Sequence, residues 1–339
     1  MGDPTASLIE AYHDLNANVV DEPEDEPSAL EFMRYVANNR PFVVRKAAIE
    51  WQAFEKWDAA HLRKVMAGED VKVAITPSGN ADAVVRQEDA RDVFVEPYEI
   101  EEPFGSFLDA IQDSSGRREV DKANVRYAQT QNDNLRNEYS PLQSEVPSDI
   151  SFARIALEQP ADAINLWLGN DRSVTSLHKD NYENIYVQIR GQKHFTILPP
   201  VEMGCVNERL LPKGRYAPDN SNVEENTDSL VVKLDTNAEP VPVATWDPDT
   251  PEENTTRYSH LAKPLRVTLQ EGDMFYLPSL WYHKVSQTVG EEGFVCAVNY
   301  WYDMDFTGQH WVGNQFVRDV YQVEQKNPDY PGLVISTEG

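Results

Sequence analysis

Two residues of this sequence, His178 and Asp180, have the spacing of a metal-binding pair. They stand one residue apart in the run TSLHKDNYENIYVQIRGQKHF. On a β-strand, residues i and i+2 point to the same face, so an imidazole and a carboxylate can be aimed at one point. A second imidazole is available from His283, in the distant run FYLPSLWYHKV. The three side chains match the two-histidine, one-carboxylate set of non-haem Fe(II) oxygenases.

A His-x-Asp pair is common, so the pair alone does not establish a metal site. Imidazole and carboxylate also suit manganese or zinc, and ligand type therefore leaves the metal open. Three further features favour a metal site. The second histidine lies in a separate β-rich run after the turn Gly272-Asp273, a lysine follows His178 beyond a glycine turn, and the number of predicted strands fits a barrel that brings these residues together.

The lysine, Lys193, indicates a second part of the site. It follows His178 by fifteen residues and stands just after Gly191. A dicarboxylate that chelates a metal through its keto-acid end needs its far carboxylate neutralised, and one lysine with hydroxyl donors such as Thr175 and Tyr127 would do this. The alternative is an exposed turn lysine, which is the commoner setting for this residue type.

Helices and strands alternate in the first part of the chain. Predicted helices span 5–20, 28–39, 51–66 and 104–113, and predicted strands span 41–47, 71–77 and 124–133. Ser28, with Glu31 three residues later, indicates a capping box at the second helix. An acidic linker is predicted at 21–27, and a second acidic segment at 91–105 carries aromatic residues between its charges.

From residue 154 onward the chain is predicted to be β-rich. The candidate strands are 162–168, 173–177, 183–190, 193–198, 229–234, 264–270, 273–277, 282–288 and 294–301. Short strands with turn signals between them favour an antiparallel sandwich or barrel. Segment 212–256 shows little periodicity beyond SLVVKL and is interpreted as a functional or loosely ordered insertion. Apolar spacing predicts a closing helix at 309–325.

Charge and composition narrow the class of partner. The 339 residues include 57 acidic and 30 basic side chains, for a net charge of -27. Such a field repels nucleic acid and anionic membranes and attracts a basic peptide or protein, although solubility alone is an alternative explanation. No apolar run is long enough to span a membrane, and no signal peptide is recognisable. Two cysteines in this length indicate a reduced intracellular protein, cytoplasmic or also nuclear.

The two runs quoted above, together with AVNYWYDMD, RPFVVRKA, VRYAQTQNDNL, AINLWLG and VATWDPDTP, resemble the JmjC oxygenases over nearly the whole chain. Within that family the sequence is most similar to the Jumonji lysyl hydroxylases that act on developmentally regulated GTP-binding proteins. The resemblance implies a mainly β fold with flanking helices, built on a double-stranded β-helix (jelly-roll, cupin-like) core. It also implies Fe(II), 2-oxoglutarate and dioxygen as cofactor and cosubstrates.

The resemblance implies a division of the chain and a set of site residues. Residues 1–125 would pack on the barrel, 126–304 would form the JmjC core with an insertion at about 205–260, and 305–339 would hold the C-terminal helix. The residues that match the metal ligands, and hence the catalytic centre, are His178, Asp180 and His283. The residues that match the 2-oxoglutarate pocket are Tyr127, Thr175, Asn184, Tyr186, Lys193 and Asn299. Asn299 lies one residue out of the expected spacing.

The implied activity is lysyl hydroxylation of a basic peptide or protein, a GTP-binding protein among the candidates, by a homodimer that pairs through its terminal helices. Two alternatives stay open: demethylation of N-methyl-lysine at the same iron, and a non-catalytic cupin-like binding module. The complete metal and lysine set argues against the second. A lysine substrate needs its ammonium held by carboxylates or aromatic faces, for which the acidic run 96–102 and Glu183 are candidates.

Overall fold

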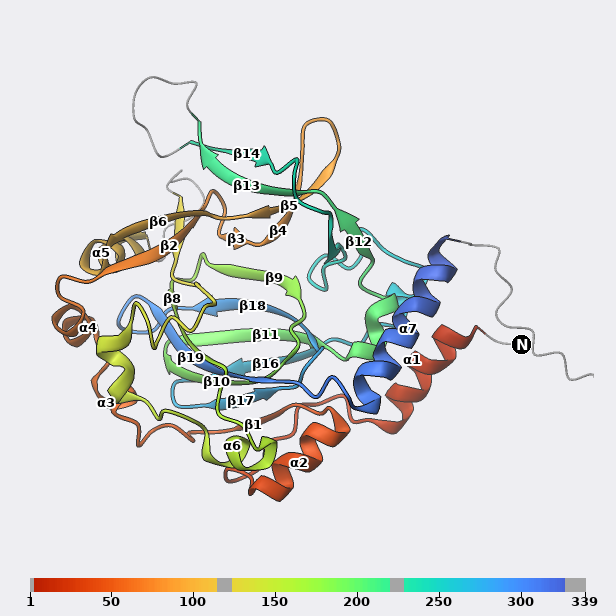
Figure 1. Cartoon of the computed structure of the whole chain (residues 1–339), viewed down its shortest axis with the longest axis horizontal. Helices are drawn as coiled ribbons and strands as arrows, with labels where there is room; N and C mark the ends of the chain where they lie inside the picture. The colour runs from red at the N-terminus through yellow and green to blue at the C-terminus, as the bar shows by residue number, and fades with distance from the viewer. Residues whose placement is uncertain (1–2, 115–123, 220–228, 327–339) are drawn as a thin grey trace, which may run out of the picture.

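The computed structural model describes residues 3–114, 124–219 and 229–326, and its centre is a pair of five-stranded sheets that face each other (Figure 1). The first sheet has the order β1 (Phe42–Val44), β17 (Met274–Leu277), β10 (Tyr182–Arg190), β19 (Val295–Asp303) and β8 (Ala163–Gly169). The second has the order β16 (Leu265–Leu269), β11 (Gln192–Leu198), β18 (Tyr282–Thr288), β9 (Val174–His178) and β3 (Asn80–Ala81). The predicted jelly-roll core is confirmed, and β1 and β3 from the N-terminal part complete its sheets.

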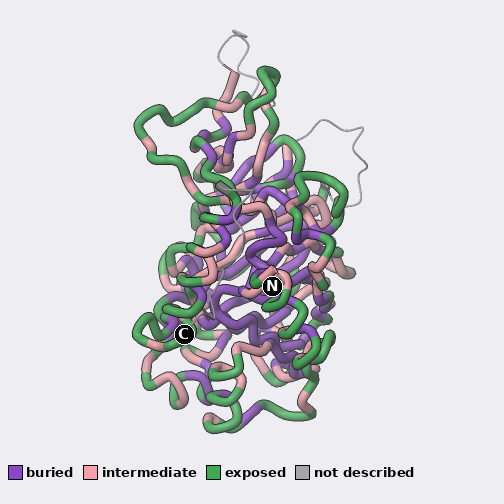
Figure 2. The backbone as a smooth tube through the Cα atoms, turned by 90° about the vertical axis from the view of Figure 1, so that its right-hand side faces the viewer, coloured by how far each residue is buried: buried purple, intermediate pink, exposed green. Residues whose placement is uncertain are grey.

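The first sheet is buried on both faces, which explains its nearly continuous apolar runs. Along β10, Ile185, Val187 and Ile189 pack outward against the flanking helices. Tyr186, on the alternate face, packs inward with Phe195 of the second sheet. Figure 2 shows the result, with buried backbone through the middle of the molecule and exposed backbone around it. The inward face of β10 therefore lines the barrel interior.

Helices cover the outer face of the first sheet. These are α2 (Ala29–Asn38), α3 (Gln52–Lys56), α4 (Ala59–Val65) and α6 (Ser151–Leu157). Helix α5 (Phe104–Ser114) packs instead on the strands β2 (Asp70–Thr76), β6 (Tyr98–Pro103) and β7 (Val125–Tyr127). The predicted capping box of α2 is present: Ser28 N donates to Glu31 Oε2 at 2.8 Å, and Glu31 N donates to Ser28 Oγ at 3.3 Å. Phe32 of α2 stacks edge-on against Phe152 of α6, with ring centroids 5.0 Å apart. The pattern analysis missed α6, which lies just before the β-rich part.

The terminal helices α1 (Pro4–Leu15) and α7 (Gln309–Lys326) lie side by side at one edge of the barrel (Figure 1). Thr5 Oγ1 donates to Glu324 Oε2 at 3.0 Å, so the two helices contact each other within one chain. The prediction carried the first helix to residue 20, but the backbone becomes extended at Asn16. Within the described ranges, no helix has both the length and the apolar character of a membrane span.

A layer of smaller sheets, which we name the roof, covers the open end of the barrel beside β9 (Figure 1). The roof consists of β4 (Ala83–Arg86), β5 (Asp92–Glu96), β12 (Glu208–Leu211), β13 (Lys213–Pro218), β14 (Leu230–Leu234) and β15 (Val241–Ala244). Only β14 was predicted. The insertion thus forms paired strands, and β13 pairs in parallel with β5 of the N-terminal part.

A three-stranded sheet closes the side of the roof. It contains β2 (Asp70–Thr76), β6 (Tyr98–Pro103) and β7 (Val125–Tyr127). The strand predicted at 124–133 ends early, because the chain turns after Tyr127 and Asn134 Nδ2 donates to Thr130 O within that turn. Both Val125 and Tyr127 are buried, which fixes the inward face that the sequence left open.

Candidate active site

The structure brings His178, Asp180 and His283 together at the roof end of the barrel. Strands β9 and β18 pair so that His178 lies opposite His283. One ligand atom from each of the three residues lies within 4.8 Å of the others. Asp180 Oδ2 is 3.7 Å from His178 Nε2 and 3.6 Å from His283 Nε2. Three residues placed far apart by the sequence therefore converge on one point.

Asp180 reaches this point by a different route from the one predicted. Strand β9 ends at His178, so Asp180 lies beyond it and not on a continuous strand. Its backbone carbonyl accepts a hydrogen bond of 2.8 Å from Leu280 N, in the turn before β18. This bond joins the segment that carries His178 and Asp180 to the turn before β18, the strand that carries His283.

Each histidine is oriented by a backbone carbonyl two residues before it. His178 Nδ1 lies 2.8 Å from Ser176 O, and His283 Nδ1 lies 3.1 Å from Trp281 O. A carbonyl can only accept, so Nδ1 carries the proton in both rings and the Nε2 lone pair faces Asp180. Burial, with a smaller contribution from His178, lowers the pKa of His283 to about 4. The neutral imidazole is the form that binds a metal, and this donor set fits a divalent ion such as Fe(II).

Lys193 lies inside the barrel and not at an exposed turn, which settles the alternative raised by the sequence. Its side chain is 2% exposed, and Nζ donates to Tyr127 Oη and to Gln287 Oε1, each at 3.0 Å. Trp167 also presents its ring, with the centroid 5.7 Å from Nζ. Burial lowers the pKa of Lys193 to about 7. No carboxylate pairs with it in the described chain, so an anionic ligand would supply the missing countercharge.

Tyr127 and Thr175 gather around this lysine as predicted. The Tyr127 hydroxyl is hydrogen-bonded to the side chain of Thr175 as well as to Lys193. Gly169 makes the room for the Tyr127 ring, since a Cβ at this position would lie 2.6 Å from a ring carbon. Lys193, Tyr127 and Thr175 therefore form a cluster of one amine and two hydroxyls whose chemistry fits a carboxylate.

The two predicted amides lie on the other side of the interior. Asn299 Nδ2 donates to Asn184 Oδ1 at 3.0 Å, and Trp167 Nε1 donates to Asn299 Oδ1 at 2.9 Å. Asn184 Nδ2 is buried without a hydrogen-bond partner among the described residues. Tyr186 lies opposite Asn299 in the pairing of β10 with β19. The free amide donor is a second point at which an oxygen-rich ligand would fit.

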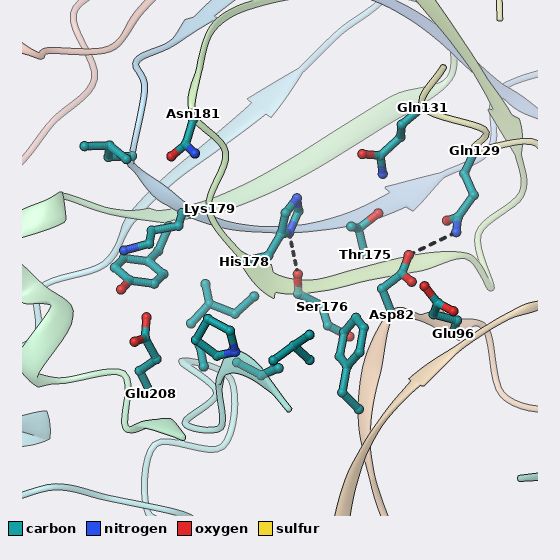
Figure 3. Close-up of a pocket in the computed structure, with 18 of the residues that line it drawn as sticks. Asp82, Glu96, Gln129, Gln131, Thr175, Ser176, His178, Lys179, Asn181 and Glu208 are labelled. Atoms are coloured by element: carbon teal, nitrogen blue, oxygen red, sulfur yellow. Dashed lines mark hydrogen bonds between the residues drawn. The ribbon is translucent and has the colours of Figure 1, made fainter. Parts of the chain in front are cut away.

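A cavity of about 760 Å³ opens from His178 toward the roof (Figure 3). Its walls come from β9, from β5, β12 and β15 of the roof, and from α7. Acidic residues on this wall include Asp82, Glu96, Glu99 and Glu208. Lys179, Arg215 and Arg318 also line the cavity, so its wall carries charges of both signs beside apolar surface. The cavity leads to the candidate metal ligands.

The structure corrects one candidate for substrate contact and adds others. Glu183 lies on the opposite face of β10 from Asn184, where Ser279 Oγ donates to it at 2.8 Å and Tyr276 also donates to it. Its proposal as an ammonium ligand was wrong, because strand alternation turns it away from the interior. Sequence reasoning missed Asp82, which lies in a turn without periodic signal.

Comparisons with known proteins agree with this geometry. Residues 27–308 match the Cupin-like domain family. A lysine-specific demethylase of Arabidopsis thaliana is 35% identical over 91% of this chain and 89% of its own. JmjC domain-containing protein E of Dictyostelium discoideum is 32% identical over 94% and 98%, respectively. A human bifunctional peptidase and (3S)-lysyl hydroxylase is 37% identical over 83% of both chains. This chain belongs to the cupin-like JmjC family, whose enzymes are 2-oxoglutarate oxygenases.

Proposed function

We propose that this protein is an Fe(II)- and 2-oxoglutarate-dependent hydroxylase that acts on lysyl residues of a protein substrate. The observation that carries the proposal is the pairing of two sites in one barrel interior. One is the cluster of His178, Asp180 and His283, and the other is Lys193, which is buried without a carboxylate partner among the described residues. A metal site alone would suit many functions, whereas a metal site beside an anion pocket suits an oxygenase that uses a keto acid.

In this proposal His178, Asp180 and His283 hold Fe(II), and Lys193 and its hydroxyl partners hold the far carboxylate of 2-oxoglutarate. Asn184 and Asn299 would face its near end. When bound, iron and 2-oxoglutarate supply the oxidising chemistry, in which dioxygen and the keto acid yield succinate, carbon dioxide and one oxygen atom for insertion into a substrate C–H bond.

The residues of the chain control position and access. The backbone carbonyls of Ser176 and Trp281 fix the ring orientation of the two histidines. Tyr186 and Phe195 form an aromatic wall, with ring centroids 5.1 Å apart, that keeps bulk water from the cosubstrate side of the interior. Substrate must therefore approach from the roof side, through the cavity beside His178.

The substrate class follows from charge and from the relatives. The net charge of -27, together with the Asp82 and Glu99 carboxylates of the cavity wall, favours a basic protein segment. The name of the human relative includes lysyl hydroxylation, and the resemblance makes a GTP-binding protein a candidate substrate. The second candidate function is demethylation of N-methyl-lysine, which the name of the Arabidopsis relative supports.

We also propose a homodimer that pairs through α7. This helix exposes Val312, Phe316 and Val323 while its opposite side contacts α1 and the barrel. Exposed apolar side chains on one helix are typical of a contact surface. Light scattering on wild type and Phe316→Glu tests this, because a dimer that uses this surface should dissociate in the variant.

Mass spectrometry of paired peptides separates the candidate functions. Anaerobically reconstituted protein would receive Fe(II), 2-oxoglutarate and air, with basic peptides that carry either lysine or N-methyl-lysine. Gain of one oxygen on lysine with stoichiometric succinate supports hydroxylation, and loss of the methyl group supports demethylation. Protein that binds no iron and forms no succinate would instead be the non-catalytic binding module.

A further inference from the structure

One carboxylate of the cavity, Asp82, has no cationic partner in the described part of the chain. Its side chain is partly buried, and the hydrogen bond that it accepts comes from Gln129 Nε2 at 3.3 Å (Figure 3). Glu96, on the same wall, is by contrast neutralised by Lys213 at 2.8 Å and by Arg215 at 3.1 Å. The unpaired charge of Asp82 therefore needs another explanation.

The position of Asp82 is set by strand pairing. Strand β3 runs parallel to β9, with Ala81 opposite Thr175, and Asp82 follows directly after β3. Figure 3 shows the Asp82 carboxylate on the same side of β9 as the His178 ring. Asp82 is not a member of the cluster that could hold the metal. It thus lies beside the candidate metal ligands without belonging to them.

The surroundings of Asp82 disfavour its charge. Burial is the main cause that raises the pKa of this carboxyl, and the neighbouring Glu96 raises it further, whereas His178 lowers it. A carboxylate in such a place costs free energy unless a cation or several donors reach it. An ammonium group that entered the cavity would pair with this carboxylate and remove the free-energy cost of its unpaired charge. The ammonium group would therefore bind more tightly.

A second polar group beside the cavity is also without a partner. Tyr282 is 2% exposed, and its hydroxyl has no hydrogen-bond partner among the described residues. Tyr282 lines the same cavity as Asp82. This hydroxyl is enclosed by protein atoms and does not reach the cavity. The polar group without a cationic partner that a ligand meets on this wall is therefore the Asp82 carboxylate.

The aromatic residues of the cavity do not offer a free cage for a methylated ammonium. Phe94, Tyr282 and Trp311 line it, but the Tyr282 ring is already covered by a cation of the protein, because Lys179 Nζ lies 5.0 Å from its centroid. Quaternary ammonium groups are held by facing aromatic rings, whereas a primary ammonium is held by hydrogen bonds to carboxylates. The wall beside His178 suits the primary ammonium.

We propose that Asp82 receives the ε-ammonium of the substrate lysine and makes the site selective for unmethylated lysine. The inference rests on the proposed function and names the group that recognises the substrate side chain. The (3S) position named for the human relative lies near the backbone, so an ammonium contact one side-chain length from the reacting carbon is compatible with it.

The backbone at Asp82 decides which substitutions test this. Its φ is +52°, in the left-handed region that Asn and Gly tolerate and that most other residues adopt at a cost. Asp82→Asn and Asp82→Gly therefore remove the charge without added backbone strain. Asp89→Asn is the matched control, since Asp89 is exposed and lies outside the cavity. Thermal unfolding of all variants checks that each is folded.

Binding of small probes gives a readout that does not depend on turnover. The protein would be loaded with Mn(II) and 2-oxoglutarate, and broadening of probe proton signals by Mn(II) would report both affinity and proximity to the metal. The probes are the Nα-acetyl N-methylamides of lysine, norleucine and trimethyl-lysine. Wild type and Asp89→Asn should bind the lysine probe about 10- to 100-fold more tightly than the norleucine probe. Both Asp82 variants should lose this preference, and the trimethyl-lysine probe should bind more weakly than lysine to wild type.

Each contrary result overturns the proposal. Equal binding of lysine and norleucine by wild type, an unchanged preference in both Asp82 variants, or tighter binding of trimethyl-lysine would do so. Oxidation of lysine peptides, measured separately, reports on the proposed function. Peptides that are oxidised while the Asp82 variants keep their lysine preference would refute the subsite alone. Loss of preference in the variants, without oxidation of any peptide by wild type, would refute the hydroxylase and leave the ammonium subsite standing.

Discussion

The barrel interior and the roof differ in how their polar groups are satisfied. In the interior, Lys193 is buried among neutral partners, and no carboxylate pairs with it in the described part of the chain. Asn184 Nδ2 is likewise buried without a hydrogen-bond partner among the described residues. In the roof, charges pair with each other at the surface, as Glu96 does with Lys213 and Arg215. Polar groups without partners in a rigid interior indicate a small ligand bound in a fixed position. An exposed surface whose charges form ion pairs can instead adapt to a larger partner.

This difference between interior and roof indicates which region would support the chemistry and which would recognise the substrate. The interior holds the groups proposed to bind the metal and the cosubstrate. His178, Lys193 and His283 lie on strands of the second central sheet, which fix them within the fold, whereas Asp180 follows β9 and Tyr127 lies on β7. The roof holds what a substrate meets first, and it is assembled from the N-terminal part and the insertion. Chemistry and recognition can therefore be separated by mutation, with the interior expected to show the larger effects.

Asp180→Ala is expected to have the largest effect. It removes one of the three ligand side chains, so Fe(II) binding and succinate formation should fall to background. Asp180 is partly exposed and lies outside the apolar clusters, so cooperative unfolding should persist. Titration with Fe(II) under anaerobic conditions, followed by a succinate assay, measures both. A variant that retains full turnover would refute the metal centre.

Lys193→Met should abolish the anion pocket and spare the metal. Methionine fills most of the lysine volume, but the carboxylate of 2-oxoglutarate would lose its charged partner, at a cost of about 2–5 kcal/mol in binding. This corresponds to roughly 30-fold or more in the dissociation constant, measurable by calorimetry. Lys64→Met, on the exposed side of α4, is the matched control. Equal affinity in both variants would contradict the assignment.

The contrast between the buried barrel and the half-exposed roof also explains which elements and site residues could be predicted from the sequence. Eight of the ten barrel strands were found within two residues, because burial on one or both faces leaves a strong apolar pattern, as along β10. Strand β1 was predicted three residues too long, and β3 was read as a turn. His178, Lys193 and His283 could be found because strand periodicity and a resemblance place them. The structure brings His178 opposite His283, and Lys193 lies four residues along β11 from Ile197, which faces His283.

The roof was missed for the opposite reason. Its strands are short and half-exposed, and their pattern is interrupted by charges; β15, for example, has four residues, none of them buried. Strand β13 pairs with β5, more than a hundred residues earlier, and no local signal reports such a partner. Asp82 was overlooked for the same reason, because its position depends on the pairing of β3 with β9.

Glu183 and Glu99 allow a comparison between a carboxylate that stabilises the fold and one that faces the cavity. Glu183→Ala would leave Tyr276 Oη and the amide and hydroxyl of Ser279 without their acceptor. We expect a loss of about 2–4 kcal/mol in the free energy of unfolding, measured by urea titration. Glu99→Ala, on the exposed cavity wall, should change stability by less than about 0.5 kcal/mol. Similar losses in the two variants would contradict the placement of Glu183.

The smallest effect is expected from a change of pH on the affinity for 2-oxoglutarate. It should depend on the interior residue Lys193 and not on Asp82 at the roof side. In the free protein, burial lowers the pKa of Lys193 to about 7, so the amine becomes neutral as pH rises above that value. Bound 2-oxoglutarate would favour the charged amine, so binding above pH 7 must take up a proton. Affinity should be full below pH 7 and fall by up to about tenfold per pH unit above it. Calorimetry in buffers of different ionisation enthalpy measures this uptake directly. Lys193→Met should show no proton uptake on binding. Asp82→Asn, which is altered only on the roof side, should keep the uptake seen in wild type. Proton uptake that survives in Lys193→Met would assign the titrating group to another residue.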